Sequence, residues 1–295
     1  MNATIRAPVA MIAFSGVLWG TSFVVMKLGL RYGDPYSFAF LRLVASFLFA
    51  AVLLFFRERP RVSVLRDWRI WVLGVLNGVG FVLQYVGISY TTATRTALIV
   101  NSNVAFTALL GWMVLHEPIG LGGFAALPLA LLGVFLLTTG GYLSTLAWGQ
   151  AIGDLLVLMS GLVWSVFLVL NKQMVSEEGS SVSQMAAWVM LVTTMSIAPV
   201  ALTVGEVRNL ALSWEAWGVI VYTATLCTVI PYVLFTKAQR SVSATLSGIV
   251  LLIEVIVAIV SSALILGEQF AIGSGLGAAL VCTSIFLASR GSSSN

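Results

Sequence analysis

A single acidic residue, Glu254, lies near the middle of the apolar run 242–266. A charge at the centre of a bilayer costs about 2.5–3.5 kcal/mol on insertion scales, so an acid there is either protonated or paired. Ser247 and Ser261 fall on the same helix face as Glu254, which predicts a polar stripe around the acid. Glu254 could carry a proton or hold a cationic group of a ligand. It could equally be a neutral acid that hydrogen-bonds between helices.

Asn103 occupies the matching position of an earlier apolar run, 151 residues before Glu254. Thr96 and Thr107 share its helix face. Amides inside membranes often join helices through hydrogen bonds worth roughly 0.6–2 kcal/mol. Asn103 is therefore predicted either to contact a ligand or to tie helices together. Asn101 falls on a different face, and we expect its role to be structural.

Two tryptophans, Trp19 and Trp164, lie deep inside apolar runs at matched positions. Tryptophan is normally enriched at membrane interfaces, and a buried indole N–H seeks a hydrogen-bond partner. Ser22 shares a helix face with Trp19, as Ser160 does with Trp164. We therefore predict that Trp19, Ser22 and Trp164 line a polar cavity. The alternative is that the two rings only pack between helices.

A polar and aromatic stripe follows one face of the run 69–90, and it consists of Asn77, Phe81, Gln84 and Tyr85. Tyr232 of a later run corresponds to Phe81. These side chains are predicted to line the same cavity. Tyr85 lies nearer the outer end, where it could be a gate or an aromatic residue of the membrane interface.

The other charges inside the runs are open to structural interpretations. Arg42, in the outer half of the run 36–56, could bind a substrate carboxylate, extend to the interface, or pair with Asp34. We favour a structural role for it. Lys27 and Lys172 lie near run ends, where lysine side chains commonly extend their ammonium groups to the interface.

Glu117 and Glu268 lie where apolar runs end, and Glu117 is followed by Pro118. A carboxylate next to a proline is typical of the first turn of a helix, so we expect a structural role. The segments Gly74–Gly78 and Gly273–Gly277 have small residues four apart, which lets helices approach closely.

No motif in the chain supports enzyme chemistry. It has no phosphate-binding glycine loop, no metal-spaced cluster and no nucleophile set, and His116 is its only histidine. Cys227 and Cys282 are embedded in apolar runs and are expected to be small apolar filler. We therefore predict no catalytic residue, no metal and no cofactor. We also predict no nucleic-acid partner, because the net charge of +4 suits anionic lipid headgroups.

The elements that must position these residues are membrane-spanning helices. Of the 295 residues, 59% are hydrophobic and 9% are charged, against roughly 25% charged in a soluble domain. A span needs about 20 apolar residues. The runs predict an all-α integral membrane protein with ten spans, at 8–30, 36–56, 69–90, 95–115, 119–140, 150–173, 182–204, 214–237, 242–266 and 270–289.

Loop charges predict the orientation of these spans. The connection between the second and third spans holds five arginines between positions 57 and 69, whereas the connection 141–150 has no basic residue. Because cytoplasmic loops are enriched in Lys and Arg, both termini are predicted to lie inside. The first run, preceded by Arg6, is long for a signal peptide, and we interpret it as a retained span.

The chain also contains an internal repeat. Trp19 and Lys27 recur 145 residues later as Trp164 and Lys172, and Glu117 recurs 151 residues later as Glu268. We divide the chain into five-helix repeats at 1–143 and 144–295. An odd number of spans per repeat inverts the second copy, which places a site at the midplane that the two halves can expose alternately.

Several short motifs give the chain a family resemblance. They are Leu18-Trp19-Gly20-Thr21-Ser22-Phe23, Phe40-Leu41-Arg42, His116-Glu117-Pro118, Leu252-Ile253-Glu254-Val255 and Gly267-Glu268-Gln269. In their order and spacing the chain resembles the EamA-type ten-span branch of the drug/metabolite transporter superfamily. The resemblance implies an exporter of amino acids and other metabolites with a central cavity. In many relatives a proline follows the glutamate of span nine, where Val255 stands here.

These observations together predict a secondary transporter that works by alternating access, with Glu254 as the proton- or cation-coupling residue. The expected cargo, from the resemblance, is an amino acid or a similar small polar metabolite, exported across a bacterial inner membrane by a multi-pass monomer in the lipid bilayer. Two alternatives stay open. One is a carrier of cationic drugs with Glu254 as the anion, and the other is a non-carrier such as a channel or a lipid-handling enzyme.

Overall fold

The computed structural model of this protein describes residues 3–101, 103–117, 151–207 and 213–268, with short stretches between 124 and 136 and between 275 and 287. Within these residues all regular structure is helical, and eight segments are long and apolar enough to span a membrane. They coincide within a few residues with predicted spans one to four and six to nine. The predicted spans at 119–140 and 270–289 and the connection 141–150 lie largely outside the described residues.

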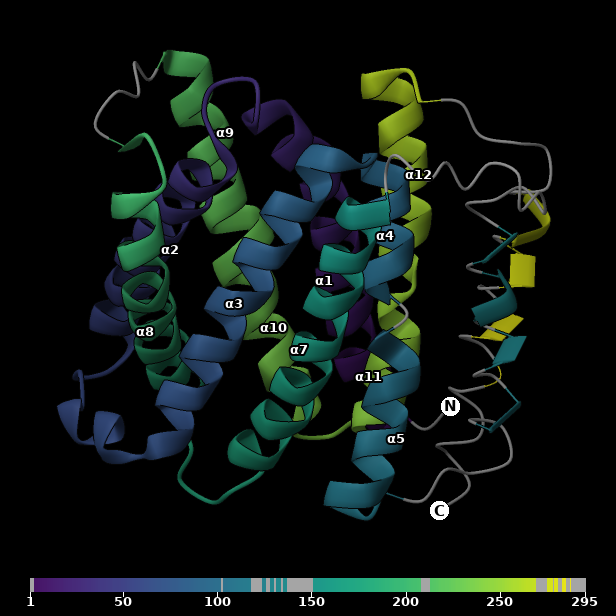
Figure 1. Ribbon diagram of the computed structural model, residues 1–295. Helices are drawn as coiled ribbons and strands as arrows, with labels where there is room; N and C mark the ends of the chain where they lie inside the picture. The colour runs from purple at the N-terminus through teal and green to yellow at the C-terminus, as the bar shows by residue number, and fades with distance from the viewer. Residues whose placement is uncertain are drawn as a thin grey trace.

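The described helices run in the following order (Figure 1). They are α1 (Ala3–Gly29), α2 (Pro35–Arg57), η1 (Val62–Arg66), α3 (Trp68–Tyr90), α4 (Ala93–Asn101), α5 (Asn103–Leu115), α7 (Ala151–Val175), α8 (Val182–Thr203), α9 (Trp214–Ala224), η5 (Thr225–Val229), α10 (Ile230–Gln239), α11 (Ala244–Leu251) and α12 (Ile253–Leu266). Two spans therefore consist of consecutive pieces, α9 with η5 and α10, and α11 with α12, whereas α4 and α5 belong to one apolar helical segment, Ala93–Leu115.

The start of α2 shows how the sequence sets a helix boundary. Asp34 accepts hydrogen bonds from the backbone N–H groups of Tyr36 (2.9 Å) and Ser37 (3.0 Å), and Pro35 occupies the first helical position. Burial opposes ionisation of Asp34, but its hydrogen bonds, including one from the Glu206 N–H, outweigh burial and lower its pKa. Asp34 is committed to this cap, so the pairing with Arg42 considered above is wrong.

Close helix contacts depend on glycines of α3. A Cβ atom on Gly74 would lie 2.4 Å from Val192 Cβ, and one on Gly78 would lie 2.1 Å from Ser196 Oγ. Both partners belong to α8, which packs along α3, with α7 against another face of α3 (Figure 1). The prediction that Gly74–Gly78 is a packing face is confirmed. Gly273 lies outside the described residues, so the second such segment is not described.

The ninth span is interrupted immediately before its acid. The N–H of Leu252 bonds the carbonyl of Ile249 (3.2 Å), and the N–H of Val255 bonds the carbonyl of Leu252 (3.1 Å). These bonds reach back three residues, so the helix tightens at Leu252 between α11 and α12. The irregularity therefore occurs with valine at 255 and does not require a proline there.

Candidate functional site

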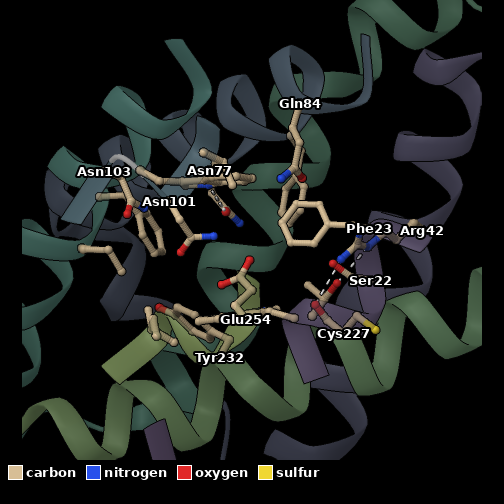
Figure 2. A pocket seen from close by; sticks show the side chains of 18 of the residues that line it. Ser22, Phe23, Arg42, Asn77, Gln84, Asn101, Asn103, Cys227, Tyr232 and Glu254 are labelled. Carbon is tan, nitrogen blue, oxygen red and sulfur yellow. Dashed lines mark hydrogen bonds between the residues drawn. The ribbon is translucent and has the colours of Figure 1, made fainter. Parts of the chain in front are cut away.

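A cavity lies between the helices, lined by a mixture of polar, aromatic and aliphatic side chains, as small-molecule sites usually are. Residues from α1 to α5 form one part of its wall, and residues from α7 to α12 form the other (Figure 2). The lining residues are Trp19, Ser22, Phe23, Arg42, Asn77, Phe81, Gln84, Val100, Asn101, Asn103, Trp164, Phe167, Leu168, Met190, Cys227, Thr228, Tyr232, Leu251 and Glu254.

The cavity gathers nearly all of the residues predicted from sequence. Every predicted site residue except Tyr85 is among those that line it, and they are Trp19, Ser22, Asn77, Phe81, Gln84, Asn103, Trp164, Tyr232 and Glu254. Tyr85 is fully buried behind the wall, where its ring packs against Phe38 at 5.9 Å. Tyr85 is therefore neither at the interface nor in the cavity lining.

Asn101 was predicted to point elsewhere, and this is wrong. Its side chain lines the cavity and faces the carboxyl of Glu254 (Figure 2). One of its amide hydrogens bonds the carbonyl of Ala97 at 2.7 Å, which fixes the orientation of the amide. Asn101 and Asn103 both line the cavity.

Ser247 and Ser261, which were predicted to share a helix face with Glu254, are not among the described residues that line the cavity. The hydroxyl of Ser247 donates to the carbonyl of Ser243 (2.8 Å), and that of Ser261 donates to the carbonyl of Val257 (2.7 Å). Both serines therefore spend their donors on their own helix. Since α12 begins at Ile253, Glu254 lies in its first turn, where the helix dipole favours a negative charge.

The indole of Trp164 has the hydrogen-bond partner that its depth requires. Its Nε1 donates to Asn77 Oδ1 at 3.3 Å, and the Asn77 amide donates to Thr193 Oγ1 at 3.2 Å. The ring meets Phe81 edge-on at 5.4 Å between centroids. Gly80 leaves room for it, because a Cβ there would lie 2.7 Å from the indole nitrogen. Trp164 is thus held by α3 while it lines the cavity.

Arg42 is only 1% exposed and lies in the cavity wall. Its Nε donates to Thr228 Oγ1 (3.0 Å), its Nη1 to the hydroxyl of Tyr85 (2.9 Å) and its Nη2 to the carbonyl of Cys227 (3.1 Å). The guanidinium also lies 4.9 Å from the ring centroid of Phe81. Arg42 therefore does not extend to the interface, contrary to one of the readings considered for it.

The carbonyl that receives Arg42 is left open by the sequence of the eighth span. In an α-helix the Cys227 carbonyl would accept the N–H of residue 231, but that residue is Pro231, which has no N–H. The chain forms a π-helical turn over Thr225–Val229 just before the proline. Such turns often occur at functional sites. Cys227, whose side chain is buried, thus contributes an acceptor through its backbone.

Two acids tie helix ends of opposite parts of the chain together. Glu117 accepts the backbone N–H of Ala244, the first residue of α11, at 2.8 Å. Glu268 accepts the N–H of Ala93, the first residue of α4, at 3.1 Å, and also the hydroxyl of Thr94 at 2.6 Å. A carboxylate is favourable at a helix N-terminus. The acids do play the predicted structural role, but the helices they cap are distant in sequence.

Two lysines complete these contacts. Lys27 donates to the carbonyls of Ile88 (2.7 Å) and Thr91 (2.6 Å) at the end of α3, and Lys172 donates to the carbonyl of Gln239 at the end of α10. Both ammonium groups therefore bond backbone carbonyls at helix ends, and their extension toward the interface stays a prediction. We call Lys27 with Glu268 the first latch and Lys172 with Glu117 the second latch. Burial raises the pKa of the Glu117 carboxyl, while the Ala244 N–H and the charge of Lys172 oppose that rise.

The described residues contain no group of three side chains able to hold a metal ion. The cavity chemistry consists instead of one guanidinium, one carboxyl, several amides and a set of aromatic rings. These groups suit reversible binding of a small polar or charged solute through hydrogen bonds, ion pairing and cation–π contacts.

Comparison with known proteins places this chain among transporters. The model of the EamA-like transporter family matches residues 6–139 and 151–290. An uncharacterized transporter of Archaeoglobus fulgidus is 27% identical over 80% of this chain and 81% of its own length. An uncharacterized transporter of Bacillus subtilis is 26% identical over 95% of this chain and 92% of its own.

Two further likenesses differ in what they show. A probable amino-acid metabolite efflux pump of Escherichia coli is 24% identical over 92% of this chain and 91% of its own length. A solved crystal structure superposes with a TM-score of 0.76 at 16% identity and covers 97% of both chains. At that identity the superposition shows a shared fold alone.

Proposed function

This chain belongs to the EamA-like transporter family, and from that premise we propose that it is a secondary transporter working by alternating access. The cargo is a small polar metabolite of the amino-acid class, moved outward through the central cavity. The name of the Escherichia coli relative supports this cargo class. Because the chain crosses the membrane several times, the cargo can pass through the protein from one aqueous side to the other.

The observation that carries the proposal is the central cavity with its mixed wall. Trp19 and Asn103 of the segment 1–143 face the same space as Trp164 and Glu254 of the segment 144–295. Sites at the interface of two transporter repeats are exposed alternately when the repeats rock against each other. The amides and the single acid supply hydrogen bonds to a polar cargo, and the aromatic rings pack against its apolar part.

The two latches support the proposed inverted repeat. Glu117 and Glu268 lie 151 residues apart, as do their partners Ala93 and Ala244. Each acid belongs to one repeat and caps a helix of the other. In the proposed arrangement the first latch closes the outer end of the cavity and the second closes the cytoplasmic end, so alternation would break one while keeping the other.

The proposed orientation has both termini in the cytoplasm of a bacterial cell, with ten spans and a single chain as the working unit. The ion pairs of Arg69 support the placement of two connections at one end. Arg69 binds Asp67 and Glu177, which belong to the connections after α2 and after α7, and it holds the pKa values of both carboxyls below their usual range.

Transport of cationic drugs is the second candidate. The favouring observation is that Glu254 is the single carboxyl among the described residues lining the cavity, which also include Trp19, Phe81 and Trp164. An acid surrounded by aromatic rings also suits an organic cation. The two candidates differ in whether the cargo needs a carboxylate.

Reconstitution in liposomes tests the proposal. Purified protein should catalyse saturable counterflow of one or more amino acids from a panel, while protein-free liposomes should not. Trp19→Ala and Trp164→Ala, which remove cavity walls, should weaken counterflow more than they lower thermal stability. Uptake linear in concentration, without counterflow, would indicate a channel instead. Uptake of organic cations alone would favour the drug carrier.

A further inference from the structure

We propose that Arg42 is the anion receptor of the cavity and that the cargo is a zwitterion, with its carboxylate at Arg42 and its ammonium group at Glu254. This inference rests on the proposed transport function and deepens it by assigning the cargo's two charges to two residues. Arg42 comes from α2 and Glu254 from α12, and both side chains line the same cavity (Figure 2).

The first argument is the unbalanced charge of Arg42. The guanidinium stays protonated in proteins, and it is buried in the span α2. Within the described residues no carboxylate lies within 4 Å of it, since the ion pairs there involve only Arg61, Arg69 and Arg95. An isolated buried charge is costly. An anionic group of the cargo would offset that cost.

The second argument is that neutral partners orient Arg42 without neutralising it. Thr228, Tyr85 and the Cys227 carbonyl accept from three of its five N–H groups, and Met26 Sδ at 3.1 Å receives a fourth. One N–H of Nη2 has no acceptor among the described residues. The guanidinium is thus fixed in direction with a donor to spare, which is how a binding group is prepared for an incoming anion.

The third argument is the charge balance of the cavity. Arg42 and Glu254 are its only Arg, Lys, Asp or Glu residues among the lining side chains described. One positive and one negative site match a molecule that carries one carboxylate and one ammonium group. A phosphorylated cargo would bring two negative charges and meet only one cation. A purely cationic cargo would leave Arg42 with no anion beside it.

A purely structural role is the competing explanation, because the same bonds tie α2 to η5. The two explanations differ in their consequence for ligand choice. A structural Arg42 contributes equally for any cargo. An anion receptor contributes only for a cargo with a carboxylate, and removing the charge from the cargo should then have the same effect as removing it from the protein.

The test therefore varies the ligand on the unaltered protein first. Full-length protein in liposomes is assayed for counterflow against L-leucine and L-phenylalanine, their amides and the corresponding decarboxylated amines. The free acids should be preferred about 10–100-fold, the size expected for a charge-assisted hydrogen bond. Arg42→Gln should remove that preference, and Arg42→Lys should retain part of it. Thermal midpoints and gel filtration check that both variants fold.

Each outcome decides between the possibilities. Equal transport of acids, amides and amines by the unaltered protein would overturn the role of Arg42 and leave the carrier function intact. A preference for acids that persists in folded Arg42→Gln protein would overturn it as well. If the Arg42 variants do not fold, the comparison of acids with amides on the unaltered protein still decides. No counterflow of any probe would overturn the proposed function itself, and the zwitterion assignment with it.

Discussion

At the scale of single residues, Glu254 combines a membrane-embedded position with a lack of ionic partners. Among the described residues it is the single acid that lines the cavity, and no Lys or Arg of that part of the chain lies within 4 Å of it. Its neighbour Asn101 is a neutral amide, and Ser247 and Ser261 bond their own helix. We propose that this carboxyl is protonated while the cavity is empty and ionises when a cationic group binds beside it. Release of the proton and binding of the cargo would then both take place at the carboxyl of Glu254.

Glu254→Gln tests this linkage because it keeps the shape and fixes the group as neutral. The variant should fold and stay monodisperse. It should lose the pH dependence of transport and any accumulation driven by a proton gradient, while exchange of cargo for cargo can persist. The measurement is counterflow and gradient-driven uptake between pH 5.5 and 8. Ser261→Ala, which removes a hydroxyl bonded to its own helix, is the control and should behave as the unaltered protein. An unchanged pH profile in Glu254→Gln would reduce the acid to a helix contact.

Whether a residue's place in the cavity could be predicted from sequence depended on whether its contacts are local or come from distant parts of the chain. Trp19, Asn77 and Glu254 were predictable, because a polar or interface-preferring residue inside a long apolar run needs a polar surrounding. Arg42 remained open, since its acceptors Thr228 and the Cys227 carbonyl are about 186 residues away in the chain. The helix wheel placed Asn101 away from the predicted cavity, although its side chain lines the cavity and faces Glu254.

At the scale of elements, the close packing of α3 on α8 can be tested with a matched pair of glycines. Gly74→Leu should destabilise the protein by about 1–3 kcal/mol or more, because the side chain must displace Val192 and the α8 backbone. Gly218→Ala, in α9, is the control. A Cβ there meets nothing within 4 Å, so the change should be neutral or slightly stabilising. Thermal unfolding in detergent compares the two. Equal stability of both variants would contradict the packing role.

The π-helical turn of the eighth span gives a second prediction at this scale. Pro231→Ala supplies an N–H that can bond the Cys227 carbonyl inside the helix, in competition with Arg42. The variant should bind carboxylate-bearing cargo more weakly, by about two- to tenfold, with thermal stability equal or higher. Counterflow affinity and the thermal midpoint are the two measurements. A lowered stability with unchanged affinity would mean that the proline serves packing alone.

The elements themselves were largely predictable, since apolar runs of about 20 residues have few other folds available. Their interruptions were less so. Pro231 indicates the π-helical turn of the eighth span in the sequence. The tightening of the ninth span at Leu252 has no glycine or proline at that position that would predict it. Helix boundaries set by distant side chains were also hidden, as with Glu268 at the first residue of α4.

At the scale of the whole molecule, the orientation can be checked with single cysteines in a cysteine-free version. Arg59→Cys lies in the connection after α2, and Tyr32→Cys lies in the connection after α1; both positions are exposed. A membrane-impermeant thiol reagent should reach residue 59 only from the cytoplasm and residue 32 only from outside. Labelling of both from one side would remove the inverted repeat from the proposal.

The two latches are built alike from unlike sequences. His116 and Gly267 both adopt left-handed backbone conformations, with φ of 51° and 68°. In each case the next residue, Glu117 or Glu268, donates its N–H six residues back along the preceding helix. This turn ends the helix and directs the glutamate at the N-terminus of a helix from the other half. The same local geometry therefore joins the end of α5 to the start of α11 and the end of α12 to the start of α4.

Neutralising one latch should consequently open one end of the cavity and leave the other closed. Each carboxylate bond to a backbone N–H is worth about 1.5–3 kcal/mol, enough to shift a balanced conformational equilibrium about 10–100-fold. Cys227 lines the cavity and is buried, so in a Cys282→Ala background its labelling rate reports access. Glu117→Gln should speed labelling from the cytoplasmic side only, and Glu268→Gln from the outside only.

Acidification offers a check on the same latch that needs no substitution in it. Because burial raises the pKa of Glu117, this carboxyl gains its proton at a higher pH than an ordinary glutamate as the solution becomes more acidic. A neutral Glu117 loses its ionic attraction to Lys172 and to the start of α11. Acid lowers the thiolate fraction of Cys227 in both proteins, so lowering the pH should increase cytoplasmic labelling of the unaltered latch relative to that of Glu117→Gln. If both latch variants speed labelling from the same side, the two acids do not guard opposite ends, and alternating access needs different gates.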